Sequence, residues 1–270
     1  MEDLVRVLLE CVKAVRDEVL PILGSPEAVE ELGVGAGGDK TARVDVVAED
    51  AILEALSNSG IPLRVVSEER GVLDLGAGEP QYYAVLDPID GSTNALRGIP
   101  FIATSIAFSK TSNLHDVVAG VVADLGRGDT YWAEAGKGAW KNGVRISTSG
   151  RTVLEDATIG VDFKSLAFRR ILDTLTDVLA KAGHVRHFGA NALEICYVAD
   201  GRMDAFVDIR GRLRVTDIAA AYLIVREAGG VMLRPDGSEV EAELSPTSRV
   251  SFVAASTREL FEEIRDALRV

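Results

Sequence analysis

The sequence predicts an α/β protein, with an α+β first half over residues 1–150 and an α/β second half over residues 151–270. Two observations support this prediction. In the first half, two helical patterns precede a series of short β-branched and aromatic runs, which indicates helices packed on one large sheet. In the second half, strand-like runs alternate with helical patterns, as they do in α/β folds.

The first half opens with two amphipathic helices. Apolar residues recur at helical spacing between charged ones, so we expect a helix over residues 2–20 that ends near Pro21. A second helical pattern runs from Val44 to Leu56 and stops at the turn-forming residues 58–60. Strands are expected next at residues 63–66, 82–86, 102–108, 117–122 and 130–133, and the Asn142-Gly143 pair predicts a tight hairpin turn.

The second half alternates strands with helices. No stretch rich in proline and serine separates it from the first half, so we expect the two halves to pack as one rigid body. A cleft between them is the expected place of a functional site. Strands are predicted at residues 157–161 and 205–208, and helices at 166–182, 192–199, 218–228 and from residue 258 onward.

Charge and composition disfavour several classes of protein. The 29 Lys and Arg residues against 42 Asp and Glu residues give a formal net charge of −13, which repels a nucleic-acid backbone. The first 20 residues are unlike a secretory leader, and no run of 18 apolar residues occurs, so we expect a cytoplasmic protein with no membrane partner. The two cysteines, Cys11 and Cys196, predict neither a disulfide framework nor a zinc site. A phosphate substrate would need a divalent cation to offset the local repulsion.

The most informative segment is Asp87-Pro-Ile-Asp-Gly-Ser-Thr-Asn94, directly after the apolar run 82–86. Pro88 disfavours a helix here, while Gly91 allows a sharp turn, so two carboxylates and two hydroxyls can face one point. Clustered hard oxygens suit Mg²⁺. The alternative is an ordinary surface turn, for which Asp-Pro and Asp-Gly pairs are typical.

Further acids occur where strands end or helices begin. Glu68 and Glu69 end the apolar run 63–66, and Asp217 starts a helical run. Solvated loop positions for the two glutamates and a helix cap for Asp217 are the alternatives. Asp45 is a weaker candidate, because it can simply cap the second helix. The combination of these acids favours a metal site over several unrelated structural roles.

Together these segments resemble the magnesium-dependent, lithium-sensitive phosphatases that include inositol monophosphatase and fructose-1,6-bisphosphatase. Residues 87–94 are similar to the first signature of that family, and residues 216–230 to the second, with Glu68 and Asp45 in the expected order. Residues 188–201 and 208–215 resemble most the archaeal branch, in which one protein serves both sugar bisphosphate and inositol phosphate. Ser92 stands where the family usually has Thr, so a hydroxyl is kept.

The resemblance implies a layered α-β-α-β-α sugar-phosphatase fold and Mg²⁺ as cofactor, in two or three ions, with Mn²⁺ as a substitute. We also expect a homodimer or homotetramer. The implied ligands are Glu68, Asp87 and the Ile89 carbonyl for one ion, Asp87, Asp90 and Asp217 for a second, and Glu68 with Glu69 or Asp45 for a weaker third.

The resemblance also implies catalytic roles for Ser92, Glu68 and Asp45. Ser92, oriented by Asp45 and with Glu68 nearby, would position a metal-activated water for attack on phosphorus, with no phosphoenzyme. Asp90, Gly91, Ser92 and Thr93 would contact the phosphate, partly through backbone amides.

Three further residues are implied to recognise the substrate. Arg186, Asn191 and Arg210 would contact the sugar or its second phosphate, since a guanidinium fork suits a phosphate. The alternative for each arginine is surface charge pairing.

The glycine-rich run 33–38 fits the pattern G-x-G-x-x-G, but an acidic helical stretch precedes it where a dinucleotide-binding turn needs an apolar strand. A flexible loop is therefore expected. The resemblance implies that this loop closes on the site with Asp39 and Lys40.

The sequence thus predicts a metal-dependent phosphomonoester hydrolase acting on a small phosphate ester. The expected activity is fructose 1,6-bisphosphate 1-phosphatase with inositol 1-phosphate phosphatase activity. One alternative is a nucleotide phosphatase of the same superfamily that acts on 3′-phosphoadenosine 5′-phosphate. A non-catalytic module that binds Mg²⁺ or phosphate is the alternative from a different class.

Overall fold

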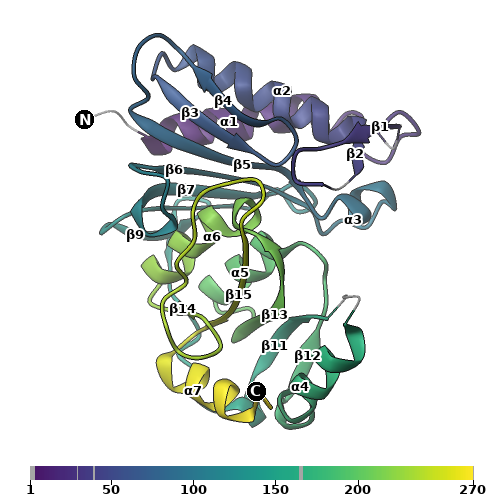
Figure 1. Cartoon of the computed structure of the whole chain (residues 1–270), viewed down its shortest axis with the longest axis vertical. Helices are drawn as coiled ribbons and strands as arrows, with labels where there is room; N and C mark the ends of the chain where they lie inside the picture. The colour runs from purple at the N-terminus through teal and green to yellow at the C-terminus, as the bar shows by residue number, and fades with distance from the viewer. Residues whose placement is uncertain (1–3, 29, 39, 164–166, 270) are drawn as a thin grey trace.

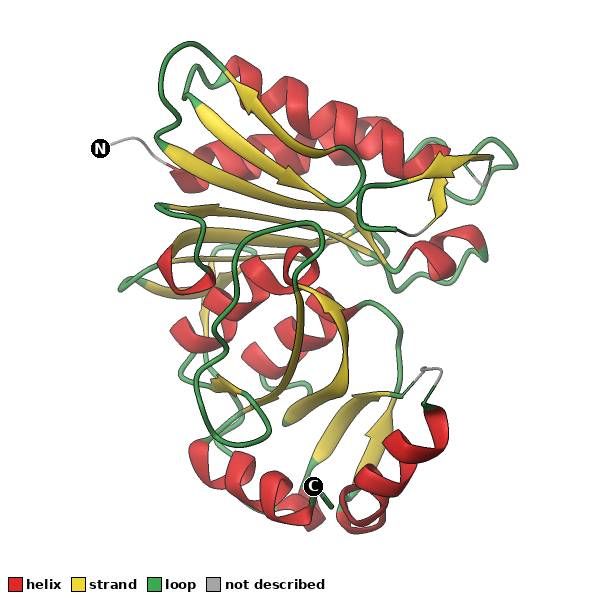
Figure 2. Cartoon of the chain, viewed as in Figure 1, coloured by secondary structure: helices red, strands yellow, loops and turns green. Residues whose placement is uncertain are grey.

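The computed structural model describes residues 4–28, 30–38, 40–163 and 167–269. Helices and two large sheets alternate in five layers (Figures 1 and 2). Three buried apolar clusters fill the spaces on either side of the two sheets. The α-β-α-β-α arrangement confirms the fold class expected from the sequence.

The first layer consists of α1 (Leu4–Val19) and α2 (Arg43–Asn58), which cover one face of an eight-stranded sheet (Figure 1). Their apolar stripes face the sheet, as the helical spacing predicts, and most of their charged residues face outward. Asp45 and Glu49 of α2 are the buried exceptions. The β3–β5 pair is parallel and the other pairs are antiparallel. The strand order is β10 (Val144–Ile146), β9 (Gly138–Lys141), β8 (Thr130–Glu134), β7 (Val117–Asp124), β6 (Ala103–Ser109), β5 (Tyr82–Asp90), β3 (Leu63–Ser67) and β4 (Gly71–Leu75).

The middle layer holds α5 (Asn191–Ala199) and α6 (Val215–Glu227) between the two sheets. Every residue of α6 from Val215 to Val225 is buried, because a helix enclosed on all sides has no solvent face. Close approach to the sheet depends on small residues, since a Cβ at Gly120 of β7 would lie 2.9 Å from the Ala220 Cα. These contacts join the two halves of the chain directly.

The second sheet has five strands and is mixed. Its β11–β12 and β11–β13 pairs are parallel, whereas β13–β15 and β14–β15 are antiparallel. The outer layer, α4 (Phe168–Lys181) and α7 (Arg258–Ala267), packs on its far face (Figure 2). The strand order is β12 (His184–Arg186), β11 (Thr158–Asp162), β13 (Ala205–Arg214), β15 (Arg249–Ala255) and β14 (Val231–Leu233).

Several predicted boundaries were wrong. The strand predicted at 82–86 continues to Asp90, and the strand predicted at 205–208 continues to Arg214. In both cases the strand resumes pairing with its neighbour after an irregularity, which local sequence patterns do not reveal. The predicted starts of the first helix, at residue 2, and of the helix at residue 166 lie outside the described residues.

The glycine-rich run 33–38 was expected to be a flexible loop; its residues 35–38 lie between the two strands of a small hairpin, which was not expected. Its strands are β1 (Glu31–Val34) and β2 (Lys40–Ala42), which pair antiparallel. Asp39 lies outside the described residues. The short elements α3 (Ser92–Leu96), η1 (Leu114–Asp116) and η2 (Leu154–Asp156) complete the structure. No described helix is both long enough and apolar enough to cross a membrane.

Candidate functional site

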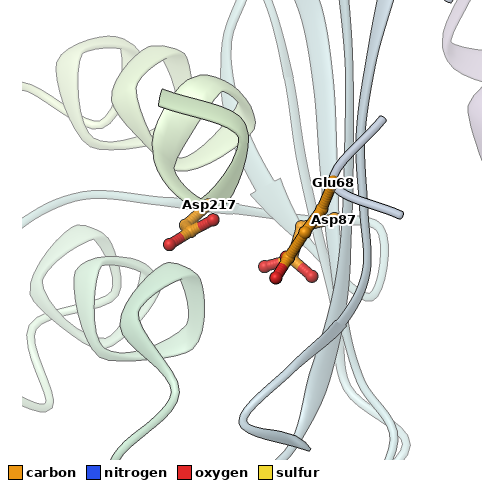
Figure 3. A group of neighbouring side chains, drawn as sticks. All are labelled: Glu68, Asp87 and Asp217. Atoms are coloured by element: carbon orange, nitrogen blue, oxygen red, sulfur yellow. The ribbon is translucent and has the colours of Figure 1, made fainter. Parts of the chain in front are cut away.

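Three buried carboxylates meet where the eight-stranded sheet contacts α6. Glu68 directly follows β3, Asp87 lies in β5, and Asp217 is in the first turn of α6. Their side chains point toward one another from the sheet and from the helix (Figure 3), with one oxygen of each within 4.8 Å of the others. Because β3 and β5 are parallel neighbours, their carboxyl ends lie at the same edge of the sheet. The structure therefore brings together these three predicted metal ligands.

Burial raises the free energy of the ionised carboxylates in this cluster. Glu68, Asp87 and Asp217 are only 8%, 2% and 5% exposed, which rules out a surface turn for Asp87 and a solvated loop position for Glu68, whereas Glu69 is half-buried. Burial, together with the charges of the neighbouring acids, raises the pKa of Asp87 and of Glu68 well above the ordinary values. The Asp87 Oδ1 atom is buried without a hydrogen-bond partner among the described residues.

These residues fit a divalent cation. Buried charges are costly unless they are paired or coordinate a metal, and carboxylate oxygens are the donors that Mg²⁺ prefers. Glu68, Asp87 and Asp217 would hold such an ion, with the unpartnered Asp87 oxygen as one donor.

Asp90 is directed toward α5 and does not belong to the three-carboxylate cluster. Its oxygens accept the amides of Asn191 at 2.9 Å, Ala192 at 2.7 Å and Leu193 at 3.4 Å, so the carboxylate caps the helix. Burial, with the charge of Asp217, raises the pKa of Asp90 to about 7. Its role as a metal or phosphate ligand stays a prediction.

Ser92 and Asp45 are brought together from positions 47 residues apart. The Ser92 Oγ atom lies 3.3 Å from Asp45 Oδ1 and 3.0 Å from the Ile89 carbonyl oxygen. This carbonyl is the one predicted to be a metal ligand. Asp45 Oδ2 also accepts the Ala42 amide at 2.7 Å, so Asp45 both caps α2 and contacts Ser92. Burial raises the pKa of Asp45 to about 7.

Gly91 is required by both space and backbone conformation. Its φ is 90°, and a Cβ there would lie 3.0 Å from the Ala190 Cβ and the Phe101 carbonyl oxygen. This turn starts α3, where Ser92 is half-buried and Thr93 is exposed. The amides of the first helical residues have no carbonyl within the helix to which they can donate.

The β1–β2 hairpin lies against the loop that follows β3. The Ala36 amide donates to the Glu69 carbonyl at 2.9 Å, and the Gly37 amide to the Glu68 carbonyl at 2.7 Å. The Glu69 carboxylate accepts the Thr41 hydroxyl and so contacts the hairpin, outside the three-carboxylate cluster. Lys40 pairs with Glu31 inside the hairpin at 2.8 Å.

The predicted substrate residues have different surroundings. The Arg210 guanidinium is already paired, at 2.5 Å with Asp208 and at 2.8 Å with Asp162, and it lines a cavity of about 400 Å³. Arg186 is exposed at the end of β12, donates to the Val185 carbonyl at 2.9 Å, and makes no hydrogen bond to the cluster among the described residues. The Asn191 Oδ1 atom is buried and, within the described part of the chain, unpartnered.

The carboxylate cluster lines neither the cavity of about 560 Å³ near Arg234 and Arg249 nor the cavity of about 400 Å³ that Arg210 lines. The β1–β2 hairpin and an arginine lie beside Glu68. That arginine, Arg214, contacts Glu68 and lies 3.1 Å from Asp217. Sequence analysis missed it, although its i,i+3 spacing from Asp217 at a helix start was a usable signal.

Glu194 is a second residue that sequence analysis missed. It is fully buried in α5, and its Oε1 atom accepts the Gly189 amide at 3.0 Å and the Phe188 amide at 3.3 Å. The Oε2 atom is buried with no partner among the described residues. Burial raises the pKa of Glu194 to about 8, so a neutral acid supports the segment that leads into α5. Its position within an otherwise apolar helix, Asn191–Ala199, was the available signal.

Replacing Glu194 with Gln is expected to flatten the pH dependence of stability. The folded-state pKa of about 8 exceeds the ordinary 4.5, so the unfolded chain loses this proton first as the pH rises. Wild-type stability should fall relative to Glu194→Gln from pH 4.5 to 8, by a few kcal/mol at about 1.4 kcal/mol per pKa unit. Denaturant unfolding of both proteins across this range measures the difference, and parallel curves would contradict the assignment.

Comparison with known proteins gives a consistent result. The family model described as the inositol monophosphatase family matches residues 1–269. A fructose-1,6-bisphosphatase/inositol-1-monophosphatase of Methanothermobacter thermautotrophicus is 39% identical, covering 98% of this chain and 96% of its own. A bifunctional NADP phosphatase/NAD kinase of Methanococcus maripaludis is 34% identical over 94% of this chain, which spans 47% of that longer protein.

Solved structures agree. A crystal structure described as an inositol monophosphatase–fructose 1,6-bisphosphatase superposes with a TM-score of 0.86 at 32% identity, covering 99% of this chain and 100% of the other. The match extends over both sheets and all five layers, so it includes every element that carries the carboxylate cluster. This chain belongs to the inositol monophosphatase family.

Proposed function

We propose that this chain is a Mg²⁺-dependent phosphomonoester hydrolase that removes the 1-phosphate of fructose 1,6-bisphosphate and the phosphate of inositol 1-phosphate. The observation that carries the proposal is the meeting of Glu68, Asp87 and Asp217, three buried carboxylates from three separate elements. Two relatives at 39% and 32% identity, each named fructose-1,6-bisphosphatase/inositol-1-monophosphatase, support both substrates.

The chemistry divides between the cation and the chain. A divalent cation at the carboxylate cluster supplies Lewis acidity, which offsets the charge of the phosphate and lowers the pKa of water in contact with it. Ser92 and Asp45 then orient the attacking water, because the Ser92 hydroxyl is held between Asp45 Oδ1 at 3.3 Å and the Ile89 carbonyl at 3.0 Å. Asp45, with its pKa raised to about 7 by burial, can accept a proton at Oδ1 through Ser92 near neutral pH.

The start of α3 binds the phosphate in this proposal. The left-handed Gly91 turns the chain so that the amides of Ser92 and Thr93 stand at the start of the helix, where anions are favoured. Asp90 sets the distance between this turn and α5, since it accepts three amides at the start of that helix.

A panel of four substrates tests the proposal. Phosphate release should require Mg²⁺ or Mn²⁺ and should be fastest on fructose 1,6-bisphosphate and inositol 1-phosphate, compared with 3′-phosphoadenosine 5′-phosphate and NADP. Cation binding without phosphate release from any of the four would favour a non-catalytic binding module and would contradict the proposal.

A nucleotide substrate is the second candidate. It is favoured by one observation, the 34% identity to a relative named as a bifunctional NADP phosphatase/NAD kinase over 94% of this chain. Hydrolysis of NADP or of 3′-phosphoadenosine 5′-phosphate with a kcat/KM above that for both sugar phosphates would establish it. The same carboxylate cluster would serve either substrate, so the panel decides between them.

Arg210→Ala is expected to lower kcat/KM for fructose 1,6-bisphosphate at least about tenfold more than for inositol 1-phosphate. A charge-assisted hydrogen bond to the second phosphate is worth about 1.5–3 kcal/mol, and inositol 1-phosphate has no such group. The substitution leaves Asp208 and Asp162 without their partner and can reduce the fraction of folded protein. Such a loss lowers kcat/KM equally for both substrates, so the ratio of the two values is unaffected.

Arg186→Ala, assayed on the same two substrates, is the variant to compare with Arg210→Ala, because it also removes one arginine that was predicted to contact the substrate. Equal losses on both substrates in Arg210→Ala would remove Arg210 from the specificity role, since the pairing with two carboxylates would then be its whole function. The exposed Arg186 would become the next candidate.

A further inference from the structure

Arg214 places a fixed positive charge inside the carboxylate cluster. Its Nη2 atom contacts Glu68 Oε1, and its Nε atom lies 3.1 Å from Asp217 Oδ1. The three side chains are 14%, 10% and 7% exposed, so this bridge between the sheet edge and α6 is largely shielded from water. One guanidinium thus engages two of the three residues that would hold a divalent cation.

The surrounding structure fixes the position of this guanidinium. Arg214 ends β13, where it pairs in register with Arg249 of β15, and α6 begins at the next residue. The hairpin closes over it, because a Cβ at Gly37 would lie 3.3 Å from both Cδ and Nη1 of Arg214. Arg249 holds that hairpin by donating from Nη2 to the Gly37 carbonyl at 2.9 Å. The guanidinium is therefore built into the site from three sides.

A guanidinium and a divalent cation compete for the same oxygens. Each prefers carboxylate donors, and two positive charges a few ångströms apart repel each other strongly where water is scarce. Arg214 is a counter-charge to the acids of the cluster. Burial and the neighbouring acids raise the pKa of Glu68 and of Asp87, and the charge of Arg214 opposes that rise.

We propose that Arg214 is the internal counter-ion of the cluster, which sets how tightly Glu68, Asp87 and Asp217 bind a divalent cation. Arg214 stabilises the fold when divalent cations are scarce. It weakens cation binding because it occupies the Glu68 and Asp217 carboxylate oxygens that the cation would use. This inference rests on the proposed function only in taking the cluster to be a cation site. The simpler alternative is an ion pair that ties β13 to the sheet and leaves cation affinity unchanged.

Arg214→Gln separates the two, because Gln keeps a polar side chain without the charge. Titration with Mn²⁺, followed by calorimetry or by the electron paramagnetic resonance of the free ion, should show at least about tenfold tighter binding than in wild type, the equivalent of one lost charge-assisted hydrogen bond. In excess chelator the variant should unfold at a lower temperature than wild type, and saturating Mn²⁺ should narrow that difference.

Two further variants make the test specific. Arg212→Gln removes an exposed arginine of the same strand, two residues away, and should leave Mn²⁺ affinity unchanged. Arg214→Lys keeps the charge but lacks the planar fork that reaches two carboxylates, so its affinity should lie between those of wild type and Arg214→Gln. If Arg214→Gln does not fold in chelator, the comparison of wild type with Arg214→Lys still decides.

Unchanged or weaker Mn²⁺ binding in folded Arg214→Gln and Arg214→Lys would overturn the inference. That outcome leaves the proposed function intact, provided that wild type binds Mn²⁺ and releases phosphate. A wild-type protein that binds no divalent cation would instead defeat the proposed function itself.

Discussion

Asp87→Asn should reduce Mg²⁺-dependent phosphate release by at least about 10³-fold. Asp87 is the most deeply buried member of the carboxylate cluster, and its Oδ1 atom has no hydrogen-bond partner among the described residues. A cation in such a site contributes several kcal/mol of transition-state stabilisation, and each 1.36 kcal/mol is a factor of ten in rate. Asn keeps the shape of the side chain but removes the negative charge that holds the cation.

The same substitution should not weaken the fold. Burial and neighbouring acids raise the pKa of Asp87, so a neutral side chain removes electrostatic repulsion at neutral pH. Thermal unfolding in chelator should therefore occur at an equal or higher temperature than in wild type. Steady-state assays with fructose 1,6-bisphosphate and with inositol 1-phosphate, beside Mn²⁺ titration, complete the measurement.

Asp204→Asn is the matched control. Asp204 is buried directly before β13, at the end of that strand that lies away from α6, and it accepts the Thr158 amide at 2.7 Å. It should keep wild-type kcat in the fraction that folds. Full activity in Asp87→Asn, or equal losses in both variants, would show that the cluster does not carry the reaction.

Ser92→Ala should lower kcat by about 10²–10⁴-fold with little change in KM, the range for a group that positions a proton transfer. The Ser92 hydroxyl lies within hydrogen-bond distance of both Asp45 and the Ile89 carbonyl, which fix its position. Without the hydroxyl, the attacking water is no longer oriented toward phosphorus. Asp45→Asn should act in the same direction, and the double variant should lose little more than either single one, because the two residues act as a unit.

Ser92→Thr is the informative companion. Threonine keeps the hydroxyl and restricts its rotamer, so this variant should recover most of the wild-type kcat. Mass spectrometry of enzyme quenched during turnover should find no phosphoserine at Ser92. A trapped phosphoserine, or a Ser92→Ala variant with wild-type kcat, would exclude the water-positioning role.

Local sequence patterns were sufficient for most of the fold. The helical spacing of Leu4–Val19 and of Arg43–Asn58 and the short apolar runs of the first sheet are set by which face of each element is buried. The ends of β5 and β13 were missed because each strand resumes pairing after a bulge, and pairing partners distant in sequence decide where that happens. The β1–β2 hairpin was missed for the same reason, since a glycine-rich turn has little local preference.

The sequence by itself predicted the three acids that the structure brings together in the candidate site. Glu68 and Asp87 directly follow the paired residues of two parallel neighbouring strands, so chain direction brings them to one edge of the sheet. Asp217 was predicted from its place at a helix start, and the packing of α6 brings it to them. The tertiary structure decided how each is used. It directs Asp90 to α5 and Glu69 to the hairpin, pairs Arg210 with two aspartates, and inserts Arg214 between Glu68 and Asp217.

The physical reason is the range of the interactions involved. Whether an acid is buried, paired or free depends on groups that arrive from elements 100 or more residues away. The Arg214 side chain reaches Glu68 in this way, and the Asn191 main-chain amide reaches Asp90. A residue type and its local spacing specify what chemistry is available, whereas the packing of α5 and α6 between two sheets specifies which charges face one another and at what distance.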